Sequence, residues 1–174
     1  MKKQFPLALA ALIALASLVQ AGDDSAGRGA ALLGPFKAKL KGALVAGMQE
    51  GPANAIEVCR EDAPAIAAAL SVDGVLMGRS SHRLRNRDNA APEWLVPIID
   101  AYASGEAELV PRVVKVGDDR TGYAEPISVQ PLCLTCHGSK LKVDVADRIE
   151  ALYPGDEATG FSEGDFRGVF WVEF

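Results

Sequence analysis

The chain has 174 residues, of which 49% are hydrophobic and 24% are charged, and its formal net charge is -5. This length and composition are typical of one globular domain and exclude a disordered or collagen-like chain. The excess of acidic side chains argues against nucleic acid or an anionic membrane as a partner, because both attract positive charge.

The N-terminal residues have the pattern of an export signal. Two lysines precede an apolar run over residues 5–19, and the small residue Ala21 follows. This pattern predicts a cleavable signal peptide over residues 1–21, a single domain over residues 22–174 and a periplasmic location. The apolar run is shorter than the roughly 20 residues that cross a bilayer, so no membrane span is expected after cleavage.

Two amphipathic helices are predicted after a polar lead-in. Apolar residues recur at three- and four-residue steps over residues 33–47, and a second such series covers residues 56–70. Gly51 and Pro52 separate the two series, and proline is favoured in the first turn of a helix. Cys59 belongs to the second series, so we expect it to face the interior.

Strands dominate the later part of the chain. A short strand is predicted over residues 75–77, then a polar ordered loop over residues 78–89 and a helix over residues 92–103, in which Pro97 marks either a kink or the first turn. The elements expected after it are a hairpin of strands over residues 109–116 and 123–129, a helix over residues 143–152 and a strand over residues 169–174. This order predicts an α+β domain with an antiparallel sheet and flanking helices.

Residues Cys133-Leu134-Thr135-Cys136-His137 form the C-x-x-C-H arrangement that attaches c-type haem. In this chemistry both thiols add to the porphyrin vinyl groups, and the histidine coordinates the iron. We therefore predict one covalently bound haem c per chain, with Cys133 and Cys136 as the attachment sites and His137 as an axial ligand. The export signal supports this prediction, because c-type haem is attached on the far side of the membrane.

Other uses of the cysteine pair remain open. These are a thioredoxin-like redox dithiol, a structural disulfide, and half of a zinc site completed by Cys59 and His82. A redox dithiol is expected near a βαβ unit, which the predicted order of elements lacks. None of these uses explains why a histidine directly follows the second cysteine.

Cys59 has no disulfide partner if the other two cysteines carry haem. It is then either a small buried apolar residue or the second axial ligand of the iron. Met48, Met77 and His82 are the competing candidates for that ligand. His82 lies in an arginine-rich polar loop, and both methionines adjoin apolar positions, which favours structural roles for all three.

A series of short motifs runs through the mature chain in order. It comprises Ala55-Ile56-x-x-Cys59, Gly78-Arg79-Ser80-Ser81 with Arg85-Asn86 and Asn89, Trp94, Cys133 to Gly138, Tyr153-Pro154-x-Asp156-x-Ala158-x-Gly160, and Gly164-Asp165-x-Arg167-Gly168. With these motifs the chain resembles a family of secreted c-type haem domains with a PAS-like fold and an unusual His/Cys axial pair, long catalogued as a domain of unknown function. The resemblance implies thioethers at Cys133 and Cys136, His137 as the proximal ligand and Cys59 as the opposite ligand.

Four arginines lie in the polar loop, at positions 79, 83, 85 and 87. A guanidinium matches a carboxylate in bidentate geometry, so these side chains are candidates to bind the haem propionates. Arg79 and Arg85 are the first candidates, because both lie in the family-like motifs. The alternative is that the arginines form salt bridges with acidic residues of the chain itself.

Two functions from different classes follow from these predictions. In the first, redox or ligand sensing, Cys59 leaves the iron on reduction or ligand binding, and a separate redox partner or membrane sensor reads the change. In the second, the protein is a soluble periplasmic electron carrier. We expect no enzymatic activity, because no Ser/His/Asp set, carboxylate pair or open metal position is evident in the sequence.

Overall fold

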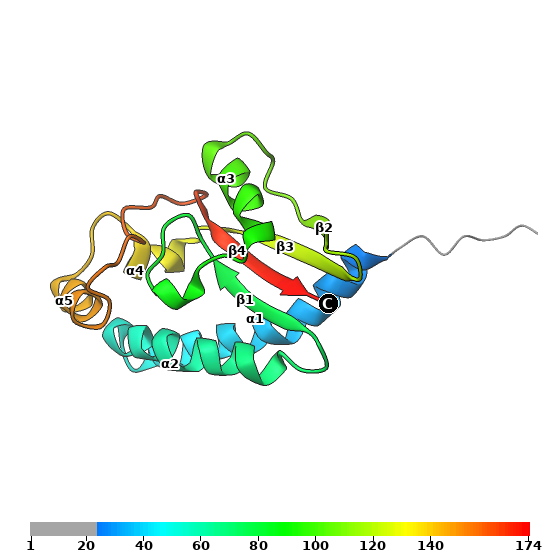
Figure 1. Cartoon of the computed structure of the whole chain (residues 1–174). Coiled ribbons are helices and arrows are strands. Elements are labelled where there is room, and N and C mark those ends of the chain that lie inside the picture. Colours follow the sequence, from blue (N-terminus) through cyan, green and yellow to red (C-terminus); the bar gives the residue numbers. More distant parts are fainter. Residues whose placement is uncertain (1–23) are drawn as a thin grey trace, which may run out of the picture.

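The computed structural model describes residues 24–174, so the predicted signal peptide over residues 1–21 lies outside the described residues. The helices and strands, shown in Figure 1, are α1 (Ser25–Gln49), α2 (Pro52–Leu70), β1 (Leu76–Ser80), η1 (Arg87–Asn89), η2 (Glu93–Leu95), α3 (Val96–Ser104), β2 (Arg112–Val116), β3 (Arg120–Ser128), η3 (Pro131–Cys133), α4 (Leu134–His137), α5 (Val143–Leu152) and β4 (Phe166–Glu173). Within this part of the chain, no helix combines the length and the apolar character needed to span a membrane.

The four strands form one sheet in the order β1-β4-β3-β2, and every neighbouring pair is antiparallel. The predicted α+β class, with an antiparallel sheet and flanking helices in one small domain, is therefore confirmed. The PAS-like part of that prediction stays a prediction. The antiparallel sheet contains no βαβ unit, which removes the structural context of a thioredoxin-like dithiol.

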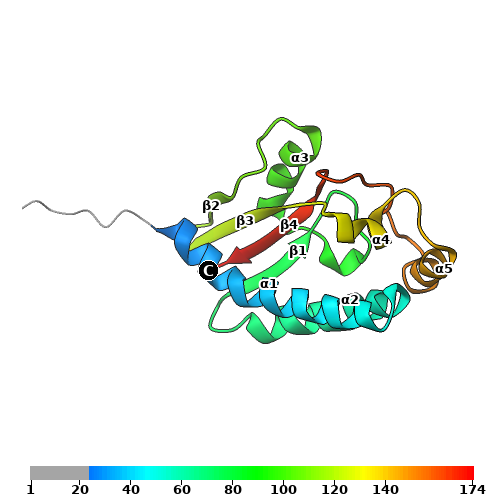
Figure 2. The same ribbon diagram turned by 180° about the vertical axis from the view of Figure 1, so that it is seen from behind.

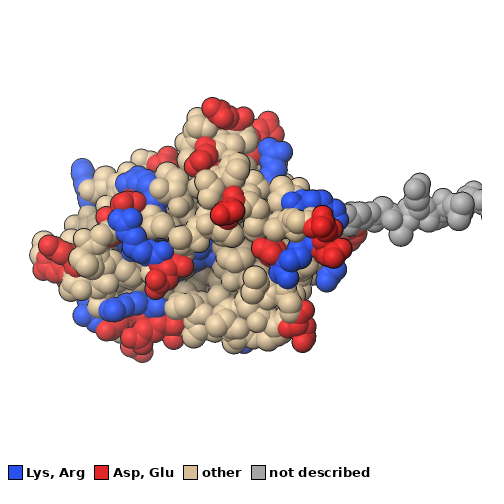
Figure 3. All heavy atoms as spheres, viewed as in Figure 1, with Lys and Arg blue, Asp and Glu red and all other residues tan. Residues whose placement is uncertain are grey.

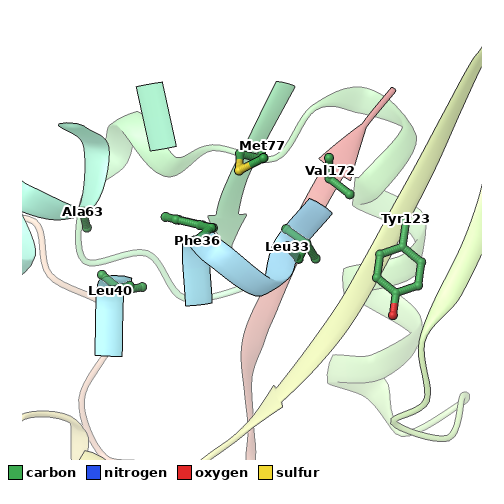
Figure 4. Close-up of a cluster of buried hydrophobic side chains, with 7 residues drawn as sticks. All are labelled: Leu33, Phe36, Leu40, Ala63, Met77, Tyr123 and Val172. Atoms are coloured by element: carbon green, nitrogen blue, oxygen red, sulfur yellow. The ribbon is translucent and has the colours of Figure 1, made fainter. Parts of the chain in front are cut away.

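Helices cover both faces of the sheet, and one apolar cluster lies under each layer. Figure 2, seen from behind, shows α1 and α2 along one face and α3 on the other. On the first face, Leu33 and Phe36 of α1 meet Met77 of β1 and Val172 of β4 (Figure 4). On the second face, α3 and η2 bury Leu95, Ile99 and Tyr102 against the sheet. Burial of such side chains contributes about 1.5–3 kcal/mol each.

The predicted helices are present, but the first begins earlier than predicted, and the helix predicted over residues 92–103 consists of the 3-10 helix η2 followed by α3. α1 begins at Ser25 because the Asp24 side chain accepts a hydrogen bond from the Gly27 backbone at 3.1 Å and caps the first turn, so the polar lead-in is helical. α2 begins at Pro52, as the Gly-Pro break predicts. Pro97 lies in the first turn of α3 and produces no kink.

The loop prediction over residues 78–89 is wrong in its first part. β1 extends to Ser80, because the backbone of residues 78–80 pairs with β4, where Gly78 lies opposite Trp171. A partner some ninety residues away thus overrides the polar local sequence. The predicted hairpin, the helix over residues 143–152 and the terminal strand are present, although β4 begins three residues earlier than predicted.

A β-bulge in β4 is the feature of the fold that most affects the site. Phe166 pairs with Ser128 and Gly168 pairs with Ile127, so Arg167 is an extra residue in the strand. A Cβ atom at position 168 would lie 2.3 Å from the Ser80 carbonyl oxygen, and the φ angle there is 154°, so the close approach requires glycine. Consecutive residues of a regular strand face opposite ways, but here Arg167 and Gly168 both line the same pocket.

Candidate haem site

A pocket of about 390 Å³ lies where α1, α2, β1, β4 and the α4 turn meet. This volume lies within the range of cofactor sites in proteins. Cys59 lines the pocket from α2, and Cys133, Cys136 and His137 line it from η3 and α4. The structure therefore brings together all four residues that the sequence predicts as attachment sites and iron ligands.

One helical turn arranges the C-x-x-C-H motif. Pro131 starts η3, whose last residue is Cys133, and α4 continues directly to His137. Residues three positions apart lie on the same side of a helix, so Cys133 and Cys136 share one face. The Gln130 backbone N–H donates to the Cys133 sulfur at 3.4 Å, which fixes this thiol at the start of the turn.

His137 is held in the form that binds a metal. Its Nδ1 lies 2.6 Å from the Ala158 carbonyl oxygen, which can only accept a hydrogen bond, so Nδ1 carries the proton and Nε2 keeps its lone pair. Burial, followed by the nearby guanidinium groups of Arg167 and Arg85, lowers the pKa of the imidazole to about 2. His137 is therefore neutral, with a fixed tautomer, as iron ligation requires.

The three cysteines are free thiols. Burial raises the pKa of the Cys136 thiol, Arg85 opposes that shift, and Cys59 and Cys133 add to it. Among residues 24–174, no group of three or more His, Cys, Asp and Glu residues is arranged to hold a metal ion directly. His82 does not line the pocket, so the four residues of the alternative zinc site are not assembled.

The competing axial candidates are separated by the fold. Met77 is 7% exposed and belongs to the apolar cluster under α1, outside the pocket lining (Figure 4). His82 stacks on Phe166, with ring centroids 5.4 Å apart, and also lies outside the lining. Met48 lines the pocket together with Cys59 and so remains a geometrically possible ligand.

The pocket lining is basic. It contains Lys37, Lys41, Arg79, Arg83, Arg85 and Arg167, and no Asp or Glu residue of the described chain belongs to it. The outer surface is different: Figure 3 shows basic and acidic side chains scattered over the same face of the molecule. An acidic protein that surrounds one pocket with cations favours an anionic group inside it.

The two propionate candidates from the sequence have different surroundings. Arg85 is only 11% exposed and binds Asp156, with Nε 3.0 Å from one carboxylate oxygen and Nη2 3.2 Å from the other. This contact matches the alternative of an internal salt bridge. Arg79 donates from Nη2 to the Cys59 carbonyl at 3.3 Å, and no carboxylate of the described residues lies within 4.0 Å of its guanidinium.

A family model described as "Tll0287-like: Tll0287" matches residues 37–174. The chain belongs to the Tll0287-like family. It is similar in structure to the cyanobacterial heme-protein Tll0287, with a TM-score of 0.61 and 25% identity over 88% of this chain and 96% of that chain. No curated protein gives a significant match.

The part of the chain that matches the Tll0287-like family includes Arg167, which our interpretation of the sequence did not assign to the site. Among the described residues no carboxylate lies within 4.0 Å of its guanidinium, whose hydrogen bond to the Arg83 carbonyl is a long contact of 3.5 Å. Burial, followed by the charges of Arg79 and Arg85, lowers the pKa of Arg167 to about 10. The sequence signal for this residue was its position beside Gly168 in the last family-like motif.

A second residue of the Tll0287-like chain was also missed as a pocket residue. Tyr153 is 8% exposed, packs with Ile56 of α2 and lines the pocket. Burial raises the pKa of its phenol, and the Cys59 thiol raises it further, so the phenol stays protonated at neutral pH. Its signal was the Tyr-Pro pair that opens the fifth motif.

Proposed function

We propose that this chain is a periplasmic c-type haem protein, with one haem c attached through Cys133 and Cys136 and with His137 and Cys59 as axial ligands. The observation that carries the proposal is that Cys59, some seventy residues before the haem motif, lines the same pocket as the motif. The similarity to the heme-protein Tll0287 supports haem as the cofactor.

The chemistry of the pocket fits a haem. Apolar side chains of Leu44, Ile56 and Phe170 offer walls to a flat macrocycle, and the basic lining suits two carboxylates. Arg79 and Arg167 are the proposed partners of the propionates, because their guanidinium groups have no carboxylate within 4.0 Å among the described residues. Arg85 is the weaker candidate, since its Nε and Nη2 atoms already bind Asp156.

Redox or ligand sensing is the proposed role. It follows from the hydrogen bonding of the two axial residues, because only one of their side chains is held by a hydrogen bond in the described part of the chain. When bound, haem iron supplies one-electron redox chemistry and a site for a small ligand. The Ala158 carbonyl holds the ring of His137, whereas no side-chain hydrogen bond of the Cys59 thiol is found among the described residues. Cys59 is therefore the residue that leaves, and α2, packed between α1 and α5, carries the change to a separate partner protein. The PAS-like fold expected from the sequence belongs to this proposal.

Electron transfer is the second candidate, and one observation favours it. Leu132 lines the pocket beside Cys133 and is 51% exposed. An apolar side chain at the rim of a haem pocket suits brief contact with a redox partner, as in small transient interfaces. Neither role requires enzymatic turnover, and we propose none.

The test of the cofactor is the mass and absorption spectrum of protein purified from a periplasm with haem-attachment machinery. The mass should exceed that of the processed peptide by one haem, and Cys133→Ala with Cys136→Ala should abolish the increase. A colourless wild type with the peptide mass alone refutes the proposal.

The test of the axial ligand compares Cys59→Ala with Met48→Ala, a matched change in the same pocket. Cys59→Ala should lose the thiolate-type ferric spectrum and gain a higher reduction potential, because an anionic sulfur stabilises ferric iron. Met48→Ala should keep both properties. An unchanged spectrum in Cys59→Ala rejects Cys59 as a ligand. Rapid binding of carbon monoxide by the reduced wild-type protein favours the sensing function. No binding of carbon monoxide, together with fast electron exchange, favours the electron-transfer function.

A further inference from the structure

Residues 156–161 connect the haem motif to the arginine-rich loop. On one side, the backbone N–H groups of Gly160 and Phe161 donate to the carbonyls of Gly138 and His137 at 3.0 and 2.9 Å. On the other side, the Glu157 N–H donates to the Leu84 carbonyl at 2.9 Å. The segment is thus fixed from both sides, and any change in it is transmitted to the backbone of the haem motif.

Both backbone polar groups of Ala158 have side-chain partners. The Ala158 N–H donates to Asp156 Oδ1 at 3.0 Å. The Ala158 carbonyl accepts from His137 Nδ1 at 2.6 Å and also from Arg85 Nη2 at 3.3 Å. His137 and Arg85 therefore share a single acceptor, and a stronger bond from one donor weakens the bond from the other.

Arg85 and Asp156 are bound to each other and to the haem motif. The pair is buried, with side chains 11% and 8% exposed, and a guanidinium fork meets both carboxylate oxygens. Arg85 Nη2 also donates to the Cys136 carbonyl at 2.6 Å. The same side chain therefore contacts the backbone of an attachment cysteine and the carbonyl that holds the iron ligand.

We propose that Arg85 and Asp156 are positioning residues for the iron ligand His137, and that through the backbone of Ala158 they set its orientation and its electron donation. This inference rests on the proposed haem site. Without Arg85, the Ala158 carbonyl accepts from His137 alone, the ring donates more strongly to iron, and the ferric state is favoured. Without the Asp156 charge, the guanidinium is uncompensated near the iron, and the ferrous state is favoured.

The experiment uses haem-loaded protein in four variants: Arg85→Gln, Arg85→Lys, Asp156→Asn and the control Arg87→Gln. Arg87 forms the neighbouring ion pair with Glu157 at 3.0 Å, but those side chains are 66% and 51% exposed, so its loss should change neither readout. The readouts are the reduction potential and the g-values of the ferric electron paramagnetic resonance spectrum, which report the orientation and donation of the axial ligands.

Opposite shifts are expected for the two charge changes. At a fixed potential, the ratio of reduced to oxidised protein should fall at least threefold in Arg85→Gln and rise at least threefold in Asp156→Asn, which is about 28 mV for a one-electron couple. Arg85→Lys keeps the charge but not the guanidinium fork. Its reduction potential should therefore stay near the wild-type value, while its electron paramagnetic resonance signals broaden.

Several outcomes overturn the inference. Wild-type g-values in both Arg85 variants mean that Arg85 does not position His137, and unchanged potentials in Arg85→Gln and Asp156→Asn mean that the pair does not tune the iron. If Arg85→Gln fails to load haem, the reduction potentials and g-values of the conservative variants Arg85→Lys and Asp156→Asn test the inference instead. A colourless wild type refutes the proposed function itself, whereas loaded variants identical to wild type refute only this inference.

Discussion

Arg167 should destabilise the protein without haem and stabilise it once haem is attached. The substitution that tests this is Arg167→Leu, which removes the charge and keeps an apolar stem over the neighbouring Phe161 ring, whose centroid lies 5.4 Å from the guanidinium carbon. Leucine also adds no group that could ligate iron. In the haem-free chain the guanidinium has no carboxylate within 4.0 Å among residues 24–174.

The magnitude follows from the pKa of the Arg167 guanidinium, which burial and the neighbouring charges of Arg79 and Arg85 lower from 12.5 to about 10. Each pKa unit corresponds to about 1.4 kcal/mol, so holding the charged form in the fold costs about 3 kcal/mol at neutral pH. Because the folded pKa lies below the unfolded pKa, the cost is complete below pH 10 and shrinks as the pH rises toward 12.5. Loss of the Arg83 carbonyl contact and of the ring contact offsets about 1–2 kcal/mol.

The assay is urea unfolding of the haem-free protein at pH 7, compared with the same measurement on the haem-loaded protein. Arg167→Leu should raise the free energy of unfolding of the haem-free protein by about 1–2 kcal/mol. In the loaded protein the sign should reverse, since removal of one partner of a buried charge pair leaves a propionate uncompensated. Arg87→Leu, at an exposed ion pair, is the control and should change neither value.

Destabilisation of the haem-free protein by Arg167→Leu, with no effect of the Arg87→Leu control, would contradict this prediction. That result would mean that the guanidinium has enough water or protein partners without haem, and that it does not require an anion. A stabilising effect of equal size in both forms would show an unpaired cation that no propionate reaches.

Three further predictions concern the fold around the site. Gly168→Ala should lower the free energy of unfolding by about 2–3 kcal/mol or more, because the new Cβ atom would lie 2.3 Å from the Ser80 carbonyl oxygen at a φ of 154°. A melting temperature within about 2 °C of the wild-type value would contradict the close approach of the two strands. Leu33→Ala should lower the free energy of unfolding in urea by about 2–5 kcal/mol, because Leu33 is fully buried. A decrease below about 1 kcal/mol would mean that α1 packs loosely. Burial, Arg83 and Arg167 lower the pKa of His82 below 6.5, so the contribution of His82 to the free energy of unfolding is present above pH 6.5 and is lost as the pH falls. His82→Gln should flatten that decline in stability. An NMR titration of His82 with a midpoint above 6.5 would refute the shift.

The sequence was sufficient to predict those parts of the fold and of the site that depend on the local spacing of residues. The three- and four-residue steps of α2 placed Cys59 on the pocket side, and the C-x-x-C-H motif is one helical turn by its own geometry. Pro52 and Pro97 lie in first turns, where the fixed φ of proline costs nothing. Such features need no knowledge of distant partners.

The features that escaped prediction depend on pairing between distant segments. Arg85 binds Asp156, 71 residues away, so the sequence could not separate an internal ion pair from a propionate contact. Arg167 enters the pocket through a bulge, and a register shift leaves no mark in the hydrophobic pattern beyond a neighbouring glycine. The hydrogen-bond acceptor for His137 is a backbone carbonyl, which no side-chain motif can show.

The place of β4 in the sheet has a consequence for the order of assembly. β4 follows every other described element in the chain, yet it lies between β1 and β3 and carries Arg167. Until residues 166–173 can pair, β1 has no neighbouring strand and the pocket lacks one wall. Both thiols of the C-x-x-C-H motif precede β4 in the chain, so under the proposed haem attachment they would be accessible on an open chain before the sheet closes around the pocket.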